Sequence, residues 1–478
     1  MRKVLLPVCC LLGTLTGISQ DKWDLRRSVE YALANNISVK QADVQARLDE
    51  LTMKQSKMAQ FPNLNFNGNG SYSSGRNQDP TTFGLVTSSL FSTSYSLQTN
   101  VNLFNWFSQR NTVEANKFFA QASRTNVDKI KNDISLNVAA AYLQCLLNRE
   151  QAGISAVQVK QTLAQLDNTR KLVNAGSVPE LNAAELEAQL ARDSSTLVTT
   201  QQTYAQSVLQ LKALLNVDAG APFEIDAPPV ESIPVENLVD LEPEVVYNLA
   251  LANLPLQRVN ELRVKGAEKN VLAARGAMYP TLSAFGSLGT RSNSISTQAV
   301  STTVVPAPQI GTVNVGANSY QVFAYSPVPF TETQFAKTPY VDQLDLNFNQ
   351  GFGLGLSVPI FNGGQSRSNY RRSKLNLENI KLQQQLDNQT LKQDIYRAYT
   401  DATAALQKFN ANKKSVETAQ KVYDFATRRY NIGLLNTIDL ITNQNNLFSA
   451  KINLILAQYD YVFKLKVLEF YKGQGIKL

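Results

Sequence analysis

Between Leu344 and Ile360 the chain alternates apolar and polar side chains with a period of two residues. The apolar positions, which are the even-numbered ones except for Gln350, are Leu344, Leu346, Phe348, Phe352, Leu354, Leu356, Val358 and Ile360. This period places successive side chains on opposite faces of a β-strand. Most strands have about 5–6 residues, whereas a strand that crosses a bilayer needs about 9–11. The pattern therefore predicts one long membrane strand with its apolar face toward lipid.

Two earlier segments alternate in the same way. Residues 64–72 alternate apolar or glycine positions with Asn and Ser, and residues 95–103 alternate apolar residues and Thr with polar residues. A loop rich in Ser, Thr, Gly and Asn separates the two segments. We expect a strand and its returning partner here.

Long helix-forming runs flank these strands. Residues 24–59 contain neither Gly nor Pro and stop at Phe61-Pro62, since proline cannot continue the helical hydrogen-bond ladder. Residues 107–175 also favour helix, and at ~1.5 Å per residue a continuous helix here would reach on the order of 100 Å. A further helix is predicted over 179–216.

The same plan occurs a second time. Residues 244–277 favour helix and stop at Tyr279-Pro280, so Pro280 repeats Pro62 at an offset of 218 positions. A larger offset of 257 positions relates the pairs Phe104 and Phe361, Tyr142 and Tyr399, Gly176 and Gly433, and Tyr204 and Tyr461. The 39 additional residues of the second copy fall in the Ser/Thr/Gln/Val-rich loop from about 290 to 340. A constant register on both sides of one insertion predicts an internal duplication.

The repeat divides the chain. We expect a signal peptide at 1–19, a first repeat at 20–218, a Pro-rich connector at 219–243 and a second repeat at 244–478. A basic start and a short apolar run are typical of a secretory signal, and Gly17 and Ser19 are the small residues of its cleavage site. Neither Cys9 nor Cys10 follows a small residue, so we expect no lipid anchor.

Charge and reactive side chains exclude several classes of protein. The formal charge of +8 is spread along helical runs with interleaved acids, as on solvated faces, so we expect no nucleic-acid partner. The chain has no histidine, the commonest general base and metal ligand. Only Cys145 remains after signal cleavage, so we expect no metal site, no cofactor and no enzyme activity.

Four strands per chain require an assembly. In lipid every backbone polar group must be paired, so a sheet must close, and the smallest membrane barrels use about eight strands. Two copies would give eight strands and a filled interior, whereas three would give twelve and leave a lumen. Inner faces rich in Gly, Ser and Asn suit an open lumen. Long polar helices must likewise pack side by side, and a heptad of coiled-coil type links Leu440, Leu447, Leu454, Tyr461 and Leu468.

The chain resembles the outer-membrane efflux (TolC-like) family. The segments that carry the resemblance are Phe61-Pro62, Tyr279-Pro280, 359–364, 429–433 and 437–441, together with the duplicated long helices. The resemblance implies a mainly α fold whose long antiparallel helices form a trimeric α-barrel in the periplasm. Each chain would add four strands to a 12-stranded barrel in the outer-membrane lipid. The implied function is passive export as a homotrimer, with a periplasmic adaptor and an inner-membrane transporter of the RND or ABC type.

The resemblance also implies a gate at a periplasmic tip. The two helix turns at Gly176 and Gly433 would form the tip, and the strand–helix breaks are Pro62, Pro280 and Pro359. Asp439 matches an acidic ring that narrows the pore, whereas Thr442 stands at the position of a second acid.

A tyrosine latch at this tip is the second implied feature. Tyr430 matches the latch tyrosine of the family. Leu435 and Asn182 occupy the positions of its charged partners, so Glu185, Arg428 and Arg429 are the nearby side chains that could replace them.

Local structure offers an alternative for these positions. Asn436 can cap a helix and place Asp439 at its third residue, where free N–H groups and the helix dipole favour an acid. Glycine after a helix is also an ordinary C-terminal stop. The alternative for the whole chain is a membrane-anchored coiled-coil stalk without transport activity, which would collect its strands at one terminus.

Overall fold

The computed structural model describes residues 22–78, 83–226, 237–294 and 296–473 of the 478-residue chain. The predicted signal peptide and the centre of the connector lie outside these ranges. Contacts divide the chain into two compact units. Unit 1 comprises Met1–Thr52, Ala115–Glu268 and Leu375–Leu478, and unit 2 comprises Met53–Glu114 and Lys269–Lys374.

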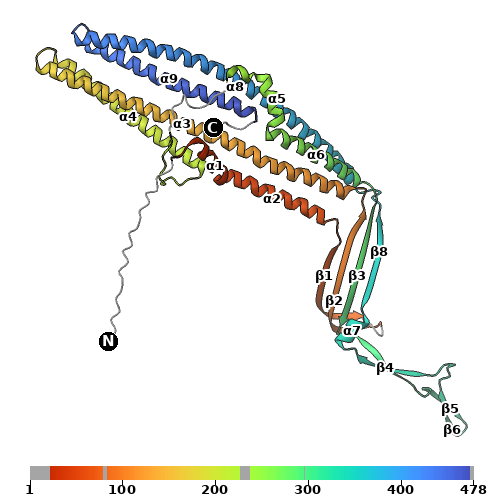
Figure 1. Cartoon of the computed structure of the whole chain (residues 1–478). Helices are drawn as coiled ribbons and strands as arrows, with labels where there is room; N and C mark the ends of the chain where they lie inside the picture. The colour runs from red at the N-terminus through yellow and green to blue at the C-terminus, as the bar shows by residue number, and fades with distance from the viewer. Residues whose placement is uncertain (1–21, 79–82, 227–236, 295, 474–478) are drawn as a thin grey trace, which may run out of the picture. The chain divides into compact units, whose positions relative to one another are not determined.

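Two long helical hairpins dominate the fold (Figure 1). The helices α3 (Ser108–Asn174) and α8 (Gln365–Asn431) have 67 residues each. They turn into α4 (Glu180–Leu215) and α9 (Thr437–Tyr471), respectively. Each of α8 and α9 begins 257 positions after its counterpart, which is the offset that the sequence repeat predicts.

The shorter helices repeat with the smaller offset. They are α1 (Leu25–Asn35), α2 (Ile37–Met58), α5 (Pro243–Asn253) and α6 (Pro255–Gly276), and a short 3₁₀ helix, η2 (Leu238–Leu241), precedes α5. Both α5 and α6 begin and end 218 positions after α1 and α2.

Each predicted single helix, over 24–59 and over 244–277, is in fact two helices. The break at Leu254 (φ −71°, ψ 131°) directly precedes Pro255, because a proline disfavours helical geometry in the residue before it. At Asn36 (φ −61°, ψ 132°) the side-chain oxygen instead accepts the N–H of Ser38 at 2.9 Å, as a cap does.

Unit 1 contains two main apolar cores, the first built mostly from the first copy and the second from the second copy. One core gathers Val138, Tyr142, Leu146, Leu211 and Ile225, and the other gathers Leu241, Val246, Ile395, Leu465 and Leu468. In the first core, burial raises the pKa of the Tyr142 phenol. Its oxygen lies 2.6 Å from the carbonyl oxygen of Asp226, so a buried hydroxyl finds its partner in the backbone.

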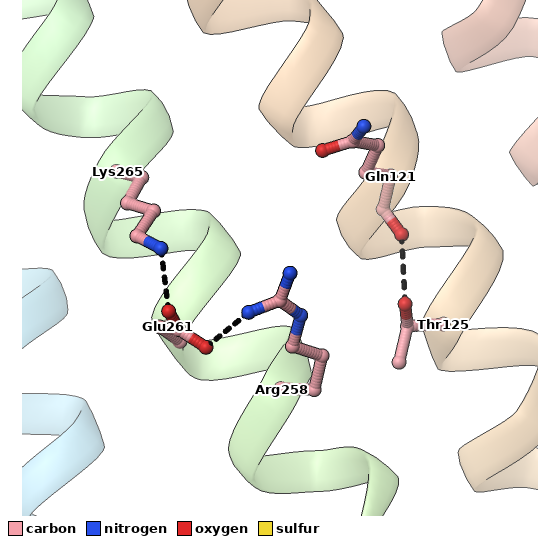
Figure 2. Close-up of polar contacts among 5 residues, drawn as sticks. All are labelled: Gln121, Thr125, Arg258, Glu261 and Lys265. Carbon is pink, nitrogen blue, oxygen red and sulfur yellow. Dashed lines mark hydrogen bonds and ion pairs between the residues drawn. The ribbon is translucent and has the colours of Figure 1, made fainter.

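Charged side chains lie along the exposed helix faces. Glu261 accepts a hydrogen bond of 2.5 Å from each of Lys265 and Arg258 on α6 (Figure 2). The hydrogen bond from Lys265 is the main cause of the lowered pKa of Glu261, and the bond from Arg258 lowers this pKa further. On α3, the Thr125 hydroxyl donates to the Gln121 carbonyl at 3.0 Å (Figure 2). No helix in the described ranges is both long and apolar enough to cross a membrane.

Unit 2 is built on one antiparallel sheet with the strand order β1-β2-β3-β8 (Figure 1). Its strands are β1 (Asn63–Gln78), β2 (Leu85–Phe104), β3 (Thr281–Asn293) and β8 (Asn349–Ser357). The four predicted strands therefore form a single sheet. Pro62 and Pro280 directly precede β1 and β3, and Pro359 follows β8.

The predicted strand from Leu344 to Ile360 is nearly twice as long as β8, which has 9 residues. Its first residues belong to a helix, α7 (Tyr340–Leu346), and the strand begins only at Asn349. The Gln343 side chain on α7 bonds to the Ser292 hydroxyl at 2.9 Å and to the backbone N–H of Asn293 at 2.8 Å. These contacts with β3 favour the helix over the alternating pattern, which carries no information about distant partners.

The predicted loop over 290–340 also contains regular structure. It holds two antiparallel pairs, β4 (Thr297–Val304) with β7 (Thr331–Lys337), and β5 (Gln309–Val315) with β6 (Asn318–Phe323). Val, Thr and aromatic residues favour strands, and Gly316, with φ +68°, lies in the turn between β5 and β6. The insertion of the second copy thus contains two antiparallel strand pairs and is not an irregular loop.

Candidate functional site

The register of the sheet places apolar side chains on one face. Phe66 pairs with Leu97, and Leu97 pairs with Leu288. The exposed members of this face include Leu64, Phe66, Tyr72, Phe91, Leu288, Phe352, Leu354 and Leu356. Phe352 has 93% of its surface exposed. A continuous apolar face of this kind requires a nonpolar environment outside the chain.

The opposite face of the same sheet is polar. Most of its residues are Asn, Ser, Gln and Gly, and their register positions alternate with those of the apolar face. Examples are Asn65, Ser96, Asn100, Ser287 and Gly351. The sheet therefore separates a nonpolar side from a wet side.

Both edges of this sheet are open. In the described chain β1 pairs only with β2, and β8 pairs only with β3. Each outer edge thus presents a row of backbone donors and acceptors without a neighbouring strand. Such edges must be paired when the sheet lies in lipid.

The two hairpin turns have the same geometry. Gly176 (φ +72°) donates to the carbonyl of Val173 at 2.8 Å, and Ser177 donates to that of Leu172 at 2.9 Å. In the second copy Gly433 (φ +75°) and Leu434 make the matching bonds, both at 2.9 Å. Both pairs of bonds form a helix C-terminal motif that needs glycine in the left-handed region. Gly176 and Gly433 therefore act as helix stops.

Asp439 occupies the third position of α9, as the capping alternative predicts. The side-chain oxygen of Asn436 accepts the backbone N–H of Asp439 at 2.7 Å. The carboxylate is exposed at the helix start, where the dipole favours a negative charge. Thr442 is exposed as well, and its hydroxyl donates to the carbonyl of Ile438 at 2.8 Å.

Tyr430 connects the two hairpins. Its hydroxyl lies 3.0 Å from the Thr169 hydroxyl, so α8 contacts α3 within the last two turns of each helix. A second link lies further from the turns, where Gln165 donates to the Tyr423 hydroxyl at 2.7 Å. Burial is the main cause of the raised pKa of Tyr423. Two tyrosines of α8 thus hold α3.

The other predicted latch residues are not brought together. Asn182 is half-buried in the first turn of α4, and its backbone N–H donates to the carbonyl of Pro179 at 3.1 Å. Across the described chain, neither Glu185 nor Arg428 forms an ion pair. Arg429 instead lies 3.4 Å from the carbonyl of Leu434 in its own turn.

The hairpins also contain a largely buried polar cluster that the sequence did not predict. We define it as Thr162, Gln189, Asp193, Gln444 and Asn445. Thr162 donates to the Asp193 carboxylate at 2.6 Å, and Gln444 donates to the Thr162 hydroxyl at 3.0 Å. Gln189 donates to Asp193 at 2.8 Å and to Asn445 at 3.1 Å. The cluster therefore joins α3 and α4 to α9.

One signal in the sequence could have revealed this cluster. Gln444 lies between Leu440 and Leu447, at a position where the helix faces the core, and it is 1% exposed. A polar residue at such a position needs a buried partner. Within the described ranges, no group of three or more His, Cys, Asp or Glu side chains is placed to hold a metal ion.

Comparison with known proteins identifies the family. The family model described as outer membrane efflux protein matches residues 29–217 and 347–474, so the chain belongs to this family. It is an outer-membrane efflux channel with a long periplasmic portion, as the resemblance implied.

Individual relatives agree with this assignment. The chain is 24% identical over 460 residues to the outer membrane efflux protein BepC of Brucella suis biovar 1, covering 95% of this chain and 86% of BepC. It is 23% identical over 470 residues to the outer membrane protein TolC of Escherichia coli, covering 96% and 84%. The solved structure of CusC, at 17% identity, superposes with a TM-score of 0.75 over 94% of this chain and 92% of CusC. The fold is therefore that of the known channels.

Proposed function

We propose that three copies of this chain form one channel, which serves as the passive exit duct of a tripartite efflux or type I secretion system. The channel would take molecules from an inner-membrane transporter, through a periplasmic adaptor, to the outside. The resemblance to the TolC-like family supports both partners and a transporter of the RND or ABC type. The chain would perform no chemistry on what it conducts.

The observation that carries the trimer is the open four-stranded sheet. Its apolar face is suited to lipid and its polar face to water, but four strands are too few to close. Three copies joined from β8 of one to β1 of the next would pair every edge in twelve strands. The stalk alternative explains neither the open edges nor the positions of the strands, which lie mid-chain in both repeats.

The hairpin turns would form the periplasmic gate of this trimer. Around a three-fold axis, Asp439 of each copy would contribute to one carboxylate ring, which favours cations by its local field. The Tyr430–Thr169 contact would hold the closed arrangement. In the same trimer, the connector 219–243 would lie in the equatorial region, between the first repeat (20–218) and the second repeat (244–478).

The direct test is the mature protein, purified in detergent and inserted in planar bilayers. We expect a trimer by native mass spectrometry and discrete single-channel conductance. Gly353→Pro, which removes a strand N–H and fixes φ, would weaken the sheet and reduce the number of channels. Pro359→Ala, just outside β8, serves as the matched control. A monomer without detergent, or the absence of conductance at every voltage, would contradict the proposal.

A further inference from the structure

An aromatic side chain, Phe285, lies on the polar face where β3 pairs with both β2 and β8. Phe285 lies on β3 opposite Asn100 of β2 and Gly353 of β8. Its register neighbours on the same face, Ser283 and Ser287, are small and polar. Half of the Phe285 surface is exposed. It is thus an exposed aromatic ring among small polar neighbours.

The glycine on β8 provides the place for this ring. A Cβ atom built on Gly353 would lie 2.7 Å from Cζ of Phe285 and 3.2–3.3 Å from its two Cε atoms. Real side chains do not approach so closely, so the ring occupies the space that a side chain at 353 would fill. It therefore spans from β3 to β8 along the wall instead of standing away from the sheet.

We infer that Phe285 is a contact site for the exported molecules and that it favours cations that carry aromatic or other flat apolar groups. The inference rests on the proposed trimer, in which three Phe285 rings would line the lumen. An exposed ring attracts cations over its face and stacks with other rings. Because the far end of the ring occupies the space over Gly353, the ring stays against the strands of the wall while half of its surface is exposed.

Current block in single channels tests the inference. Tetraphenylphosphonium, added on the extracellular side, should bind the wild-type channel better than tetraethylammonium of the same charge. In Phe285→Ser we expect the tetraphenylphosphonium affinity to fall about twofold to fivefold, with tetraethylammonium block unchanged. The matched control is Phe352→Ser, which removes an aromatic from the opposite face and should leave both affinities at the wild-type value.

A second variant tests the position of the Phe285 ring over Gly353. Gly353→Ala should displace Phe285 into the lumen and lower the conductance, and adding Phe285→Ser should restore it. Equal tetraphenylphosphonium block in wild type and Phe285→Ser, with normal channels, would overturn the contact site alone. Absence of wild-type channels would overturn the proposed function itself, so the two failures are distinguishable.

Discussion

Gln444 of α9 donates a hydrogen bond of 3.0 Å to the Thr162 hydroxyl of α3, although 282 positions separate the two residues. The Thr162 hydroxyl in turn donates a hydrogen bond of 2.6 Å to the carboxylate of Asp193 on α4. Three helices from both copies of the repeat thus meet in one hydrogen-bonded chain. Such a buried network of hydrogen bonds stabilises the fold only when each polar group keeps its partner.

Loss of Asp193 should destabilise the hairpins. In Asp193→Ala the buried Thr162 hydroxyl loses its acceptor and the Gln189 amide loses one of its two acceptors. An unsatisfied buried donor costs about 1–3 kcal/mol. A lower thermal transition of the purified protein, followed by circular dichroism, would report this loss. Glu187→Ala is the control, because Glu187 is an acid of the same helix that makes only an exposed ion pair with Arg170. Equal transitions for both variants would contradict a special role of the cluster.

Removal of the Tyr430–Thr169 hydrogen bond should ease opening of the tip. Tyr430→Phe and Thr169→Val each delete one hydroxyl of a 3.0 Å pair, and such a bond contributes about 0.5–1.5 kcal/mol. We expect a larger mean conductance in either variant. The double variant should show no further increase, because both changes remove the same bond. Additive increases would mean that the two hydroxyls act separately.

The ring and cap roles of Asp439 can be separated by two substitutions. Asp439→Asn removes the carboxylate and should weaken block by multivalent cations roughly tenfold, since three charges are lost together. Asn436→Ala removes the cap oxygen but keeps the carboxylate, so it should cost about 1 kcal/mol of stability with unchanged block. Measurements of cation block from the periplasmic side compare the two. Unchanged block in Asp439→Asn would exclude Asp439 from the pore.

Cys145 should resist modification in the folded protein. Its side chain is fully buried, and this burial raises the thiol pKa to about 11. Because the folded state disfavours the thiolate, the neutral thiol stabilises the fold below the usual pKa of about 8.5. This contribution is lost as the pH rises toward 11.

Maleimide labelling measures this protection. A protein expressed without the predicted signal peptide, residues 1–19, has no other cysteine, so labelling reports one site. We expect negligible labelling at pH 7.5 and complete labelling in denaturant. The variant Cys145→Ser with Thr196→Cys, which places a thiol on an exposed part of α4, should label at once. Rapid labelling of native wild type would show that the core around Tyr142 opens.

Local signals in the sequence predicted most of the helices, whereas distant contacts decided the exceptions. The duplication and the proline breaks predicted α3, α8 and the starts of β1 and β3, because they depend on neighbours in sequence. The Asn436–Asp439 cap was predictable for the same reason. The helix α7, in contrast, depends on the bond of Gln343 with distant Ser292. The Asn36 side chain combines its local cap with a distant bond to the carbonyl of Leu214. The polar cluster depends on the same kind of distant pairing.

The equal length of α3 and α8 limits how this protein can change in evolution. Both helices end in the same glycine turn, and Tyr430 on one meets Thr169 on the other near that end. Deletion of one residue from a single helix would shift its end by ~1.5 Å and rotate every later side chain by about a quarter turn or more. A viable change of length must therefore occur in both copies together, so that this channel can become longer or shorter only through paired insertions or deletions.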